Sequence, residues 1–64
     1  MTMAADELQT LVHDLRTPLT LVEGFSDLLV RRGDELLAPE RDEYLQRIAA
    51  AAREMRELLD RTQL

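Results

Sequence analysis

The sequence predicts an all-α protein, in which an antiparallel hairpin of two helices pairs with a second copy of itself to form a four-helix bundle. Three observations lead to this prediction. Two long segments carry apolar residues at helical spacing, and a short stretch between Gly33 and Pro39 separates them. The 64-residue chain is 45% hydrophobic but has only one Phe and one Tyr, a composition that favours helices packed along stripes of Leu, Ala and Val.

The first helix is expected over residues 4–32. Its apolar residues recur in steps of three and four, which is the period of one helix face, and Ser26 fills the single gap. Arg31 and Arg32 before Gly33 suit a helix end, because cations stabilise the C-terminal end of the helix dipole and glycine commonly follows it. The stripe consists of Leu8, Val12, Leu15, Leu19, Val22 and Leu29, widened by Leu11, Phe25 and Leu28.

A loop over residues 33–38 and a second helix over residues 39–61 follow. Pro39 suits a first helical turn, where its missing N–H is tolerated, and acidic residues there complement the helix dipole. In the loop, Leu36 and Leu37 are expected to cover the end of the helix pair. The acidic residues are Glu40, Asp42 and Glu43. The second stripe consists of Leu45, Ile48, Ala52, Met55, Leu59 and Thr62, flanked by Tyr44, Ala51 and Leu58.

Both stripes are broader than one neighbouring helix covers, and a chain of this length buries too little surface to hide them alone. A homodimer that forms a four-helix bundle hides both. The small residues Ala49–Ala52 allow neighbouring helices to approach closely. Residues 1–64 are therefore expected to form a single domain.

Composition argues against several classes of protein. A net charge of −5 disfavours nucleic-acid binding, which requires a basic patch. Cysteine is absent, so no disulfide or thiolate metal site is expected. No apolar run approaches the roughly 20 residues that span a bilayer, and no signal-peptide pattern opens the chain. We expect a soluble, cytoplasmic segment without direct membrane contact, which leaves open whether a parent protein is membrane-anchored.

The only histidine, His13, is expected on the solvent side of the first helix. If Val12 and Leu15 lie in the core, helical geometry places His13 outside the stripe. Arg16 and Thr17, three and four residues further on, share its face. Most exposed histidines have no special role, so the interpretation depends on these neighbours.

A proline follows five residues after the histidine. Pro18 has no N–H, so the carbonyl of Asp14 loses its helical hydrogen bond, and Thr17 is restrained as the residue before a proline. A proline inside a helix costs about 3 kcal/mol. Such a cost in a small domain indicates either a functional site or a bend that the packing tolerates.

Residues 13–19, His-Asp-Leu-Arg-Thr-Pro-Leu, resemble the H-box of sensor histidine kinases, whose usual form is His-(Glu/Asp)-x-x-(Asn/Thr)-Pro-Leu. The hairpin is similar in length to that family's dimerisation and histidine-phosphotransfer domain, in its histidine-kinase A form. The resemblance therefore spans essentially the whole chain. The matching residues are His13, Asp14, Arg16, Thr17, Pro18 and Leu19.

This resemblance implies that His13 accepts the γ-phosphoryl group of ATP and passes it to an aspartate of a response regulator in two-component signal transduction. The chemistry requires an exposed imidazole with a free lone pair, because two partner domains reach it in turn. Asp14 would accept the proton from the other ring nitrogen, although consecutive helical residues lie about 100° apart. An ordinary solvated carboxylate is the alternative for Asp14.

The resemblance also implies that Thr17 orients a water that dephosphorylates the regulator. Its hydroxyl is equally able to donate to the carbonyl of His13, four residues earlier. Arg16 and Pro18 are supporting residues, and Arg16 pairs either with phosphate or with an acidic neighbour. Further along the face, Gly24 leaves a flat spot for a partner, or is simply a tolerated surface glycine. The expected regulator-docking residues are Thr20, Glu23, Gly24 and Asp27.

No glycine-rich loop, P-loop lysine or acidic magnesium cluster occurs in the sequence. By resemblance, ATP and Mg²⁺ belong to a separate catalytic domain, so we expect this chain to bind no cofactor and to lack kinase activity of its own. Two alternatives stay open. One is a structural coiled-coil dimerisation module whose H-box has lost its role; the other is a stand-alone phosphotransfer protein.

Overall fold

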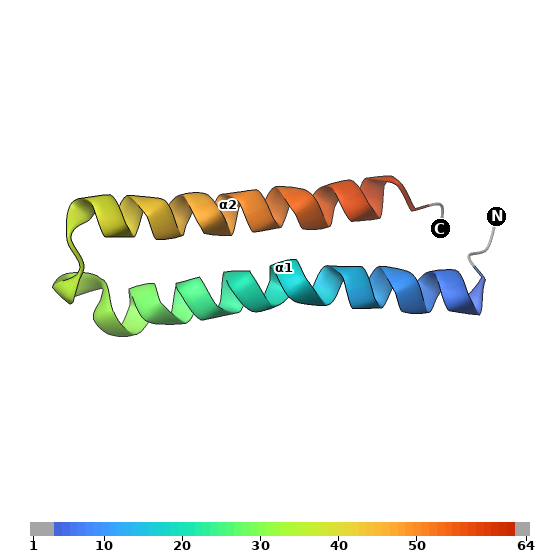
Figure 1. Cartoon of the computed structure of the whole chain (residues 1–64), viewed down its shortest axis with the longest axis horizontal. Coiled ribbons are helices and arrows are strands. Elements are labelled where there is room, and N and C mark those ends of the chain that lie inside the picture. Colours follow the sequence, from blue (N-terminus) through green and yellow to red (C-terminus); the bar gives the residue numbers. More distant parts are fainter. Residues whose placement is uncertain (1–3, 63–64) are drawn as a thin grey trace.

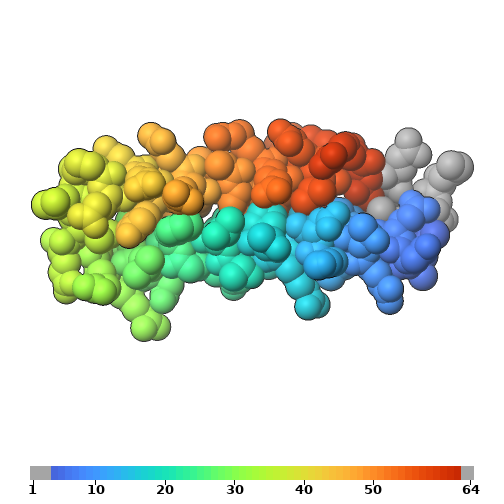
Figure 2. All heavy atoms as spheres, in the orientation of Figure 1, coloured from blue at the N-terminus to red at the C-terminus, as the bar shows by residue number. Residues whose placement is uncertain are grey.

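The computed structural model describes residues 4–62 and consists of two antiparallel helices (Figure 1). Helix α1 spans Ala5–Arg32, a short 3-10 helix η1 spans Gly33–Glu35, and α2 spans Ala38–Asp60. The chain measures 48 × 16 × 11 Å, so the hairpin is a narrow rod in which the side chains of the two helices meet along its length (Figure 2). The all-α hairpin predicted from the sequence is confirmed.

The turn confirms one expectation and differs from another. Gly33 directly follows Arg32 as the C-cap of α1, and with φ −55° and ψ −36° it continues into the 3-10 turn in the right-handed region. Leu36 is half-buried, but Leu37 is 69% exposed and does not cover the end of the helix pair. Both leucines have extended backbone, in which successive side chains point to opposite sides, so only one of them packs inward.

An aromatic stack sets the register of the two helices. The rings of Phe25 on α1 and Tyr44 on α2 have their centroids 5.1 Å apart, with an interplanar angle of 30°. Antiparallel helices keep a constant sum of residue numbers across their contact, so a step of seven residues along each helix leads to Pro18 opposite Ala51. These two are the buried residues among residues 4–62. They form the centre of the α1–α2 contact.

Half-buried residues continue this contact line above and below its centre. They recur at helical spacing, as expected for two faces packed along a rod. On α1 they are Leu11, Leu15, Val22, Phe25, Ser26 and Leu29, and on α2 they are Tyr44, Ile48, Met55 and Leu58.

Pro18 therefore packs toward α2, and α1 runs from Ala5 to Arg32 without interruption. The sequence left open whether Pro18 marks a functional site or a bend that the packing tolerates. The ring contributes apolar surface to the core, and because proline has no N–H, no donor is left unsatisfied there. Packing against α2 offsets part of the cost of a proline inside a helix.

Only half of each predicted apolar stripe is covered within one chain. Leu19 follows Pro18 by one residue and is 46% exposed, and Ala52 follows Ala51 by one residue and is also exposed. Two antiparallel helices are related by a two-fold axis that runs perpendicular to the plane containing both helix axes. A residue displaced by some number of positions from Pro18 on α1 therefore lies on the same side of this plane as the residue displaced by the same number from Ala51 on α2. The exposed apolar face formed in this way consists of Leu8, Val12, Leu19, Leu45, Ala52 and Leu59.

Replacing Ala51 tests the centre of the contact. Ala51→Leu should lower the free energy of unfolding by about 1–3 kcal/mol, because the larger side chain has no space opposite Pro18. The matched control is Ala50→Leu, since Ala50 is exposed on the same helix, and it should change that free energy by less than about 0.5 kcal/mol. Urea unfolding followed by circular dichroism measures both; equal losses would contradict this assignment of the core.

Candidate functional site

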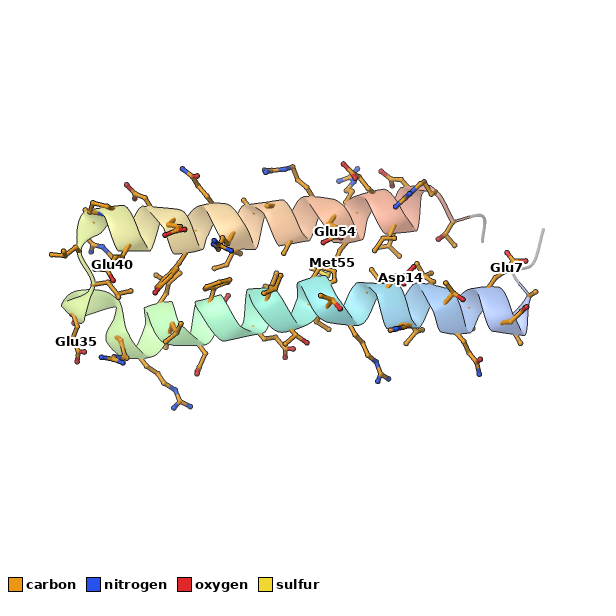
Figure 3. All side chains as sticks on the ribbon, viewed as in Figure 1. Glu7, Asp14, Glu35, Glu40, Glu54 and Met55 are labelled. Atoms are coloured by element: carbon orange, nitrogen blue, oxygen red, sulfur yellow. The ribbon has the colours of Figure 1, made fainter. Side chains whose placement is uncertain are left out.

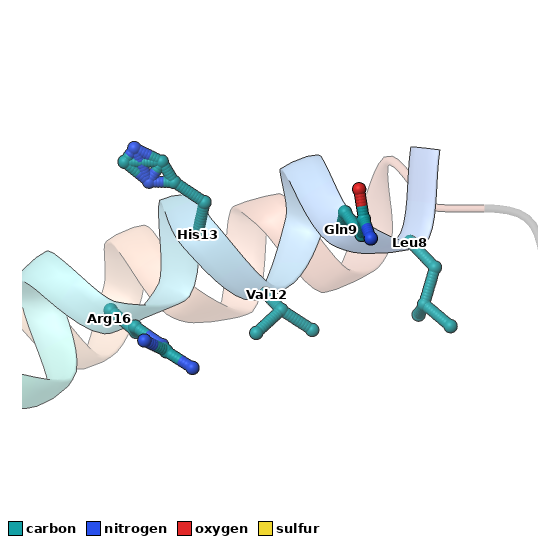
Figure 4. A pocket seen from close by; sticks show the side chains of 5 residues that line it. All are labelled: Leu8, Gln9, Val12, His13 and Arg16. Atoms are coloured by element: carbon teal, nitrogen blue, oxygen red, sulfur yellow. The ribbon is translucent and has the colours of Figure 1, made fainter. Parts of the chain in front are cut away.

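His13 lies on the surface of α1. Its imidazole projects from the helix into open space, whereas Leu8 and Val12 are directed elsewhere (Figure 4). Within residues 4–62 the ring takes part in no hydrogen bond or ion pair. It borders a shallow, open depression of about 420 Å³, which Leu8, Gln9, Val12 and Arg16 also line. The imidazole is thus free to be reached by another molecule.

The side chain of His13 and the exposed apolar face are directed to different sides of the hairpin, although Leu8 and Val12 of that face also line the depression beside His13. Thr17 precedes Pro18 by one residue and Leu19 follows it, so these two side chains flank the α1–α2 contact on opposite sides. His13 and Gly24 lie on the side of Thr17, one turn before it and two turns after it. Covering the exposed apolar face therefore leaves His13 open.

Asp14 is exposed but lies closer to α2 than to the His13 face. It comes three residues after Leu11 and four before Pro18, both of which face α2. Figure 3 shows it at the edge of α1 nearest Met55. In the described part of the chain, Asp14 makes no side-chain hydrogen bond with His13. Its carboxylate must therefore reach around the helix to meet the imidazole.

The hydroxyl of Thr17 is free in the structure. Thr10 and Thr62 each donate to the carbonyl four residues earlier, at 3.0 and 2.8 Å, but Thr17 makes no such bond between residues 4 and 62. Thr17 is exposed one turn from His13 on the same side of the hairpin. Its hydroxyl therefore remains able to bind water or a partner.

Residues 3–64 match the family model of the His Kinase A (phospho-acceptor) domain. The chain belongs to this family. The resemblance seen in the H-box is thereby confirmed. Domains of this kind are the phosphoacceptor and dimerisation units of histidine kinases, which act with catalytic domains and response regulators in two-component signalling. Neither the comparison with curated proteins nor that with solved structures gives a match.

In this His Kinase A domain, three of the four expected docking residues share the open side or the outer edge of α1. Thr20 and Gly24 lie about two and three turns further along α1 than His13, and Asp27 points away from α2, with its carboxylate 2.9 Å from Nε of Arg31. Glu23 lies toward the exposed apolar face instead. Three of the four expected positions are thus accessible to one partner.

Two exposed leucines on this side were not assigned to the site from the sequence. Leu21 and Leu28 are 44% and 38% exposed and lie on either side of Gly24. They line an open depression of about 200 Å³ together with Thr20, Gly24 and Phe25. Their seven-residue spacing beside a helical glycine was the available signal; Leu28 had been placed with the core stripe.

A Cβ added at Gly24 would meet nothing within 4 Å, so space is open above this glycine. No group of three His, Cys, Asp or Glu side chains in residues 4–62 is arranged to hold a metal ion. Neither helix, over that range, is long and apolar enough to cross a membrane.

Proposed function

We propose that His13 is the phosphoacceptor of this His Kinase A domain. A separate catalytic domain supplies the phosphoryl group from ATP, and a response regulator removes it, both in the cytoplasm. The observation that supports this assignment is the exposure of the only histidine, inside an H-box, on the side of the hairpin that stays open when the apolar face is covered.

In the first step, the lone pair of one ring nitrogen of His13 attacks the γ-phosphorus of ATP. An N–P bond forms, the bond from this phosphorus to the bridging oxygen breaks, and ADP leaves with the electron pair. Asp14 accepts the proton of the other ring nitrogen, which relieves the positive charge on the ring. Mg²⁺ and the positioning of the γ-phosphate come from the catalytic domain.

In the second step, an aspartate carboxylate of the regulator attacks the same phosphorus. The N–P bond breaks, and the imidazole regains its proton as it leaves. Thr17 promotes dephosphorylation of the regulator, because its free hydroxyl orients a water toward the phosphorylated aspartate. Its place one turn from His13 puts the two activities on one docking face.

The regulator docks on the open side, below His13. Its contact surface includes Thr20, Gly24 and Asp27, with Glu23 at the margin toward the apolar face. The open space at Gly24 and the apolar depression beside it suit the close approach of a partner helix.

A second copy of the chain covers the exposed apolar face and forms the four-helix bundle. Leu19, Leu45 and Leu59 are each close to half exposed in the single chain, and they lie on one side of the hairpin together with the small Ala52. Removing these side chains from water favours association, and it adds to the small apolar area that an isolated hairpin of this size buries. His13 lies outside this interface.

Labelling tests the phosphoacceptor directly. Incubated with the catalytic domain of a His Kinase A protein and labelled ATP, the chain should take up acid-labile label, and His13→Gln should take up none. Asp14→Asn should slow the labelling about 100-fold or more, because general base catalysis contributes at least that factor. Gln46→Ala, on exposed α2 surface, serves as the control. Absence of label on the unmodified chain would leave a structural dimerisation module as the alternative.

Two substitutions separate docking from dephosphorylation. Thr17→Ala should spare labelling and transfer to the regulator but reduce the dephosphorylation rate of the regulator. Gly24→Arg should slow both transfer and dephosphorylation, because the long side chain fills the open space that the regulator needs. Single-turnover transfer and release of inorganic phosphate measure the two rates. Equal dephosphorylation by Thr17→Ala and the unmodified chain would remove the assigned role.

Paired leucines on opposite sides of the hairpin test the dimer. Leu19→Glu should abolish dimerisation, because it places a charge in the apolar interface. Leu21→Glu should remain dimeric, because Leu21 lies outside that interface. The two leucines are a matched pair, since their side chains are 46% and 44% exposed in the single chain. Sedimentation equilibrium gives the masses. A concentration-independent monomer mass for the unmodified chain would refute the bundle.

A further inference from the structure

Within residues 4–62, Arg16 is one of the arginines of this chain that have no acidic partner. Four of the eight arginines form exposed ion pairs with a carboxylate three or four residues away, at N–O distances of 2.9–3.6 Å. Arg16 forms no ion pair within residues 4–62. The four paired arginines are Arg31, Arg32, Arg47 and Arg56.

The cause lies in the helix sequence. A side chain on a helix meets the residues three and four positions away, and around Arg16 these are Val12, His13, Leu19 and Thr20. None of them carries a negative charge. The guanidinium therefore keeps its full charge available for an anion that arrives from outside.

His13 is the neighbour of Arg16 on which the proposed reaction places an anionic phosphoryl group. Of the residues three and four positions from His13, which are Gln9, Thr10, Arg16 and Thr17, only Arg16 is charged. His13 and Arg16 line the same shallow depression, with Cβ atoms about 5–6 Å apart at this helical spacing. In Figure 4 the guanidinium lies toward Val12 and not beside the imidazole. Exposed side chains exchange rotamers within nanoseconds, so a change of rotamer brings the guanidinium of Arg16 to the imidazole of His13.

We propose that Arg16 binds the phosphoryl group on His13. The inference rests on the proposed function of His13. A phosphoryl group brings nearly two negative charges and three acceptor oxygens, and the planar guanidinium donates to two of those oxygens at once. Arg16 stabilises the phosphorylated state relative to the free imidazole. Within residues 4–62 of the unphosphorylated chain it has no ionic partner, so formation of this contact breaks no ion pair of Arg16 in that range.

The equilibrium between phosphorylated domain plus ADP and free domain plus ATP tests this role, with a cognate catalytic domain as catalyst. Arg16→Gln should lower the equilibrium constant for phosphorylation about three- to tenfold. Arg16→Lys should lower it less, because lysine keeps the positive charge but cannot donate to two phosphoryl oxygens with one planar group. Arg53→Gln is the matched control, since Arg53 is an exposed arginine of α2 that forms no ion pair in the described part of the chain.

Salt separates an ionic contact from a structural effect. The difference between the unmodified chain and Arg16→Gln should largely vanish near 1 M salt, where the screening length falls to about 3 Å. An Arg16→Gln equilibrium equal to that of the unmodified chain, or a difference that salt does not change, overturns the assignment of Arg16 while leaving His13 as phosphoacceptor. Failure of the unmodified chain to take up label at all overturns the proposed function itself.

Discussion

The burial of Pro18 opposite Ala51 determines how every other residue of the hairpin is directed. An α-helix turns by about 100° per residue, so the residue that faces the partner helix assigns a side to all the others. Thr17 and Leu19, on either side of Pro18, consequently lie on opposite sides of the hairpin. The small Ala51 allows the close approach that brings the proline ring into the core.

This arrangement separates the two surfaces that a His Kinase A domain needs. The exposed apolar face occupies one side of the rod, and His13, Thr17 and Gly24 occupy the other. A partner on one side does not compete with a partner on the other. The proline is therefore at once part of the H-box and part of the core, and its position in the core explains how α1 stays continuous through it.

Charge placement around His13 follows the same geometry. Asp14, its neighbour in sequence, lies toward α2 and must reach around the helix, whereas Arg16 is the charged residue at helical spacing from the imidazole. The carboxylate and the guanidinium thus approach His13 from different directions. In the proposed chemistry the first takes a proton from one ring nitrogen, and the second meets the phosphoryl group on the other.

The sequence by itself determined the two helical segments, because apolar periodicity is a local property, and the H-box, because it is a contiguous motif. It also predicted that His13 is exposed. Which part of each broad stripe faces the other helix was decided only by tertiary packing. The apolar stripe of α1 covers both the contact with α2 and part of the exposed apolar face. Its helical period gives only the average direction of these two surfaces, and it therefore places Leu19 and Val22 in one stripe. Only the register set by Phe25 and Tyr44 directs Pro18 inward and leaves Leu19 exposed.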